Sequence, residues 1–303
     1  MWDAIVAADA RVQAALIAGI VGLLTGFVGP ALKHAFDRWS VRHRLEVEYE
    51  YEERKKLRAL IGKYHGRVLE AAESLNHRLW NLQENQDKGW LAIGGRFEEA
   101  QEHYYFSTTV HRLIALMAYF HQFQGDAIYI DGRIAKDKDL LLLKFAKALE
   151  WALTDVALFE DLAYDGFYAT DHIFKNHLHL ACEACGTESG VFSYSEFQTV
   201  LAEGTVQDQL KPVLCLLDGL TRDEDRYRWD RIVVFHLILM AFINCFGYKM
   251  QHSSIEQLRR VAGTVCHPEV LTNLSVWMKK LGLTEAKANA DMAMVIASAV
   301  RAQ

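Results

Sequence analysis

Residues 171–185 contain the densest group of side chains that could bind a metal. Histidine, cysteine and carboxylate are the ligands of protein zinc sites, and Cys182-x-x-Cys185 has zinc-finger spacing. On one helix His172, His179 and Cys182 would share a face, because residues three, four or seven positions apart lie above one another. The candidate zinc ligands are therefore His172, His179, Cys182 and Cys185. No second Cys-x-x-Cys follows to complete a closed site, so the alternative is that these cysteines pack in a core. No other cofactor is predicted.

A second candidate chemistry is RNA cleavage by Arg231 and His236, which stand five positions apart in an apolar stretch. This spacing resembles the Arg-x4-6-His dyad of the HEPN ribonucleases, an all-helical family in which paired protomers cleave RNA in a shared cleft. The resemblance covers six residues. It departs from the family at Ile232, where a polar residue is usual. It implies a ribonuclease with Arg231 and His236 as catalytic residues, the one interpretation that calls for a nucleic-acid partner.

Other enzyme classes lack their motifs. The sequence has no Gly-x-Ser-x-Gly nucleophile turn and no Walker phosphate loop. Its net charge of −6 does not favour nonspecific binding to nucleic acid. The five cysteines are odd in number, which favours reduced thiols.

The element that organises the chain is the apolar run from Val12 to Leu32. As a helix it would span about 31 Å, the thickness of a bilayer's hydrocarbon core. We interpret residues 12–32 as a single transmembrane helix and residues 1–11 as a short extracytoplasmic N-terminus. A cleaved signal peptide is the alternative, but Met1-Trp2-Asp3 supplies no basic n-region.

Charged residues flank this run asymmetrically. Four basic residues follow it closely (Lys33, Arg38, Arg42 and Arg44), whereas Arg11 alone precedes it, beside Asp9. The positive-inside rule therefore predicts that the bulk of the chain is cytoplasmic.

Small residues recur along the predicted span at spacings of three and four. These are Ala15, Gly19, Gly22, Gly26 and Gly29. A line of small residues lets membrane helices approach closely, so it predicts a homo-oligomer. The alternative is that glycine is simply common in membrane helices.

The remainder predicts an all-α fold, because only three prolines occur and apolar residues follow helical spacing. Residues 33–84 are expected to continue the membrane helix as a stalk. Residues 85–95 form a polar break, and residues 96–303 form a multi-helix cytoplasmic domain. The expected helices of this domain are 102–124, 139–164, 171–185, 193–202, 206–217, 226–248, 254–265, 268–280 and 285–301, with a short strand possible at 128–130.

The apolar run 232–246 has two interpretations. It is short for a membrane span and contains His236 and Asn244, so a buried core helix is preferred over a second crossing. His236 is then expected to be neutral and hydrogen-bonded, and His236→Leu to be tolerated.

Together these patterns predict a membrane-anchored, self-associating helical protein that acts as an effector, sensor or scaffold through contact with a protein partner. The alternative is a membrane-tethered helical ribonuclease or metal-dependent hydrolase.

Overall fold

The computed structural model describes residues 10–128, 135, 137–166, 171–187, 190–284 and 290–301. The chain is 78% helical, which confirms the predicted all-α class. Within the described residues the strands are β1 (Gly186–Thr187) and β2 (Gly190–Val191), which pair antiparallel with Gly186 opposite Val191. The strand expected at 128–130 falls largely on residues outside the described ranges.

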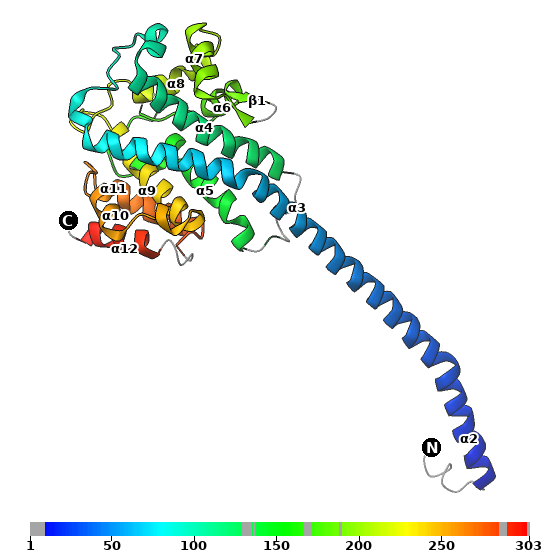
Figure 1. Cartoon of the computed structure of the whole chain (residues 1–303). Coiled ribbons are helices and arrows are strands. Elements are labelled where there is room, and N and C mark those ends of the chain that lie inside the picture. Colours follow the sequence, from blue (N-terminus) through cyan, green and yellow to red (C-terminus); the bar gives the residue numbers. More distant parts are fainter. Residues whose placement is uncertain are drawn as a thin grey trace. The chain divides into compact units, whose positions relative to one another are not determined.

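The N-terminal part is one continuous helix of 74 residues, Arg11–Glu84. It comprises α2 (Ala10–Leu23), a π-helical turn η1 (Leu24–Val28) and α3 (Gly29–Glu84) (Figure 1). Its most apolar stretch is entirely unburied: Ile17 is 62% exposed and Phe27 is 73% exposed. The predicted helix through residues 12–84 is therefore confirmed, and it carries an apolar surface that no described part of the chain covers.

The chain divides into two compact units, Met1–Lys56 and Leu57–Gln303, and the division falls inside α3. The predicted break at residues 85–95 begins where α3 ends, at Glu84, whereas this division falls earlier in the chain; the predicted domain boundary stays a prediction. The apolar repeat that suggested a stalk is buried in the core of the second unit from Tyr64 onward, as Tyr64, Val68, Leu75 and Leu82 show. An apolar stripe of this kind packs equally well on helices of its own chain, so its spacing alone could not locate the boundary.

The core of the second unit is organised around α9 (Arg228–Phe246), in which every residue from Arg228 to Ile243 is buried. It packs against α5 (Asp137–Thr154), α10 (Ile255–Ala262) and α11 (Glu269–Lys280). A helix apolar on all sides belongs in a core or a membrane, and its burial identifies it here as a core helix. The preferred interpretation of residues 232–246 is confirmed.

The other helices surround this core (Figure 1). α4 (Tyr104–Ala127) packs against α5, α6 (Lys175–Ala184), α7 (Tyr194–Ala202) and α8 (Gln207–Leu217), and α12 (Ala290–Arg301) packs against α10 and α11. Short 3-10 turns lie at Gln86–Lys88, Phe97–Glu102, Val156–Phe159 and Lys249–Gln251.

Two predicted helices differ in particular from the observed ones. The helix expected over 139–164 ends at Thr154, because the carboxylate of Asp155 accepts a hydrogen bond from the Ala157 N–H (2.8 Å) and starts a 3-10 turn. The helix expected over 171–185 begins only at Lys175.

Candidate functional site

The four predicted zinc ligands do not converge. His172 precedes α6, so it does not share the helical face of His179, and its Nδ1 lies 2.6 Å from the Tyr164 hydroxyl. Cys182 and Cys185 are buried in the core. Among the described residues no three histidine, cysteine or acidic side chains are placed to hold a metal ion. The predicted zinc site is therefore not formed by these residues.

Burial also affects the protonation of the two thiols in the metal-free chain. It raises the pKa of Cys182 well above its ordinary value and raises the pKa of Cys185 to about 12. At neutral pH both cysteines behave as small apolar core residues, which is the alternative the sequence left open.

Arg231 and His236, the predicted catalytic dyad, are both fully buried. The guanidinium of Arg231 donates to three backbone carbonyls: Nε to Asp171 (2.5 Å), Nη1 to Ala152 (2.5 Å) and Nη2 to Asp155 (3.1 Å). Such a clamp joins the end of α5 and the start of the 171–174 segment to α9. Because both side chains of the dyad are buried, an RNA substrate cannot reach them.

His236 lies in a neutral polar network inside the core. Its Nε2 is 2.9 Å from Asn76 Oδ1 and its Nδ1 is 3.2 Å from Gln83 Nε2, while the Trp80 ring contacts it edge-on. The amide nitrogen of Gln83 must donate to Nδ1, so the imidazole carries its proton on Nε2 and donates to Asn76. Burial lowers the pKa of His236 to about 3. The expected neutral, hydrogen-bonded histidine is confirmed.

The predicted association residues lie on the unburied N-terminal helix. A Cβ added at Gly19, Gly22 or Gly26 would meet no atom within 4 Å. Within η1 the Gly29 N–H bonds to the Leu24 carbonyl, five residues back. A π-turn holds one extra residue, which rotates everything after it by about 100° relative to an unbroken α-helix. Ala15, Gly19 and Gly22 thus keep their common line, whereas Gly29 turns away from it.

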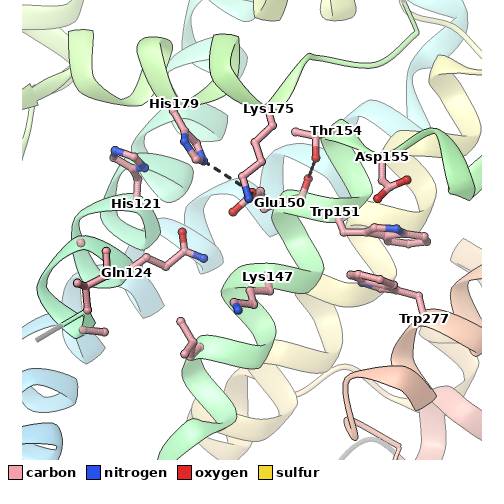
Figure 2. Close-up of a pocket in the computed structure, with 14 residues that line it drawn as sticks. His121, Gln124, Lys147, Glu150, Trp151, Thr154, Asp155, Lys175, His179 and Trp277 are labelled. Carbon is pink, nitrogen blue, oxygen red and sulfur yellow. Dashed lines mark hydrogen bonds and ion pairs between the residues drawn. The ribbon is translucent and has the colours of Figure 1, made fainter. Parts of the chain in front are cut away.

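Sequence spacing did not reveal a cavity of about 630 Å³ between α4, α5, α6 and α11. Figure 2 shows its polar wall, where Lys175 Nζ lies 2.6 Å from Glu150 Oε1 and His179 Nε2 lies 3.7 Å from the same oxygen. The ring of His179 lies against that of His121, with centroids 4.7 Å apart. Of these residues the sequence singled out only His179, because the others come from different helices and no local pattern links them.

Two stacked indoles, Trp151 and Trp277, form another part of this cavity's lining, with centroids 4.8 Å apart (Figure 2). The carboxylate of Glu150 is already paired with Lys175, and burial lowers the pKa of His179. The Thr154 hydroxyl donates to the Glu150 carbonyl (2.9 Å). The described lining residues therefore include a carboxylate paired with a lysine and a neutral imidazole, but no activated nucleophile. Such a lining suits ligand binding.

Comparisons with known protein families, with curated proteins and with solved structures find no match to this chain.

Proposed function

We propose that residues 12–32 cross a membrane once and that the protein acts there through self-association and contact with a protein partner, as an effector, sensor or scaffold. The observation that carries the proposal is the apolar helix whose side chains are unburied in the residues described. Lipid removes such side chains from water, and a helix satisfies its own backbone hydrogen bonds there.

A cleaved signal sequence also has an apolar N-terminal helix. The unbroken α3, Gly29–Glu84, argues against cleavage, because its C-terminal half belongs to the core of the second unit. Cleavage sites of this kind follow small residues in the A-x-A pattern, and the sequence has no clean one after residue 32.

The proposed orientation places residues 33–303 in the cytoplasm. It is supported by the basic residues Lys33, Arg38, Arg42 and Arg44, which follow the span. None of the five cysteines, all of which lie in the described residues, forms a disulfide, as a reducing compartment favours.

The orientation is tested with epitope tags in intact cells. A tag after Gln303 should be protected from added protease, and a tag before Met1 should be digested. Detergent treatment, which exposes both tags, is the control. Digestion of the C-terminal tag in intact cells would refute the orientation, and recovery of the protein in the soluble fraction would refute the anchor.

Self-association is proposed to use the line of Ala15, Gly19 and Gly22, with Gly26 beside it. Replacing Gly22 and Gly26 by Ile adds branched bulk where helix backbones would touch, while the span stays apolar enough to insert. The double variant should reach the membrane but cross-link into smaller species.

Two matched variants test whether a loss of cross-linking comes from the glycine line itself or from added side-chain bulk anywhere on the helix. Ala14→Ile adds similar bulk about 100° away on the same helix, and Gly29→Ile lies beyond the π-turn. Both should cross-link like the unmodified protein. Equal cross-linking by all variants would show that the glycines only face lipid.

A further inference from the structure

Two arginines in the second unit lie together without an acidic partner. Arg78 of α3 is 7% exposed, and its Nη2 donates to Thr108 Oγ1 (2.8 Å) while its guanidinium lies 4.1 Å from the Tyr105 ring centroid. Arg112 of α4 donates from Nη1 to the Ser74 carbonyl (3.0 Å). Neither forms an ion pair with any aspartate or glutamate in the described ranges.

The absence of a counter-charge is unusual for buried arginine, since buried charges are normally paired. Arg228 in the same unit illustrates the usual arrangement, because its guanidinium is paired with Glu224. At Arg112, by contrast, burial and the positive charge of Arg78 both lower the pKa. The two guanidinium groups therefore repel each other and are only partly hydrated. A bound anion would remove this electrostatic cost.

A cavity of about 530 Å³ opens beside this pair. Arg112 and Thr108 line it, and Thr108 connects it to Arg78. Arg67, Glu70 and Glu196 are the other charged residues of its lining. Glu196 accepts hydrogen bonds from the Ser193 N–H (2.8 Å) and hydroxyl (2.7 Å) as part of a helix cap.

Aromatic rings from two parts of the chain form much of the cavity lining. They belong to Tyr104, His111 and Tyr119 on α4 and to Phe192 and Tyr194 at the start of α7. Several are held in place: His111 Nε2 lies 2.9 Å from the Phe192 carbonyl, and the Tyr194 hydroxyl lies 3.0 Å from Ser107 Oγ. The cavity thus combines Arg112, which forms no direct ion pair with an acidic side chain of the described residues, with fixed ring faces.

We propose that this cavity binds a nucleotide-sized phosphate ester, with its phosphate on Arg112 and its planar ring against the tyrosines. A phosphate carries a charge of about −1.5 to −2 at pH 7, which would offset the positive charges of Arg112 in the cavity lining and of Arg78 next to it. The guanidinium fork fits phosphate oxygens in a bidentate manner. Aromatic side chains stack on nucleobases, and the cavity volume lies within the range of small-ligand sites.

The test is calorimetric titration of the full-length protein in detergent with AMP, adenosine and inorganic phosphate. AMP should bind saturably and at least tenfold more tightly than either adenosine or inorganic phosphate. Arg112→Gln should weaken AMP binding at least tenfold. Arg96→Gln, which removes an exposed arginine paired with Glu99 (3.3 Å), should leave binding unchanged. Absence of AMP binding, or equal binding by Arg112→Gln, would overturn the proposal.

A stability measurement distinguishes a ligand-binding role from a structural one. Without ligand, Arg112→Gln should melt at the same or a higher temperature than the unmodified protein, because the repulsion with Arg78 is relieved. Saturating AMP should raise the melting temperature of the unmodified protein only. Tyr119→Leu, which keeps both charges, should weaken AMP binding several-fold but leave phosphate binding unchanged. A lower melting temperature of Arg112→Gln with an undiminished AMP-induced rise would overturn the proposal.

Discussion

His236 makes the stability of the second unit depend on pH in a way that can be calculated. Its folded pKa is about 3, against an ordinary value of 6.5. Between these values the unfolded chain binds a proton that the folded chain does not, so the free energy of unfolding rises with pH in this window and falls on acidification. At about 1.36 kcal/mol per pKa unit, going from pH 7 to pH 5 removes about 2 kcal/mol of stability through this residue.

The perturbation is His236→Leu, which eliminates this titration but leaves the buried amide oxygen of Asn76 without its donor. An unsatisfied buried group costs about 1–3 kcal/mol, so the variant should be less stable at pH 7. The structure thus changes the expectation that leucine would be tolerated. At pH 5 the unmodified protein has lost the stability that neutral His236 contributes. The difference in free energy of unfolding between it and His236→Leu should therefore shrink to near zero or reverse. Asn76→Leu combined with His236→Leu removes both polar partners and should recover much of the loss at pH 7.

The assay is urea unfolding of the detergent-solubilised chain at pH 7 and pH 5, followed by tryptophan fluorescence, to which Trp80 beside His236 contributes. His77→Leu makes the same substitution at an exposed histidine and serves as the matched control. A difference between His236→Leu and the unmodified protein that stays the same at both pH values would refute the assignment of His236 as a buried neutral group.

Two further predictions concern other positions. Arg231→Met should lower stability by at least about 3 kcal/mol, because three buried carbonyls lose their donor; a urea midpoint within the error of the Arg96→Gln control would contradict the proposed clamp. Gly62→Ala, on an open face of α3, should raise stability by about 0.5–1 kcal/mol, whereas Gly219→Ala should lower it by about 1 kcal/mol, because Gly219 has φ +67°. Thermal melts of the two variants that shift in the same direction would contradict the second prediction.

Local periodicity was enough to predict the helices and the continuous N-terminal helix. It also identified residues 232–246 as a core helix, because a short apolar run containing His236 and Asn244 suits a core better than a bilayer. It could not locate the boundary at residue 57, since Leu57, Tyr64 and Val68 would look the same in a stalk and in a core.

The candidate sites were harder to predict, because they depend on which helices become neighbours. His179 was expected beside Cys182 but faces Glu150 of α5 and His121 of α4. Arg78 and Arg112 are 34 positions apart, and no local sequence pattern links them. A missing counter-charge can be recognised only when the burial of the arginine and its neighbours in the structure are both known.

The Arg231 clamp also has a consequence for local motion. Arg231 of α9 bonds to the end of α5 at Ala152, to Asp155 directly after it and to Asp171 of the segment 171–174, and the Ile173 N–H of that segment bonds to the Leu153 carbonyl of α5 (3.0 Å). This segment cannot detach without breaking the bonds at Asp171 and Ile173, which would remove one acceptor from the buried guanidinium. In hydrogen exchange the amide of Ile173 should therefore behave as part of α9, opening only when that helix opens, although it belongs to a connecting segment and not to a helix.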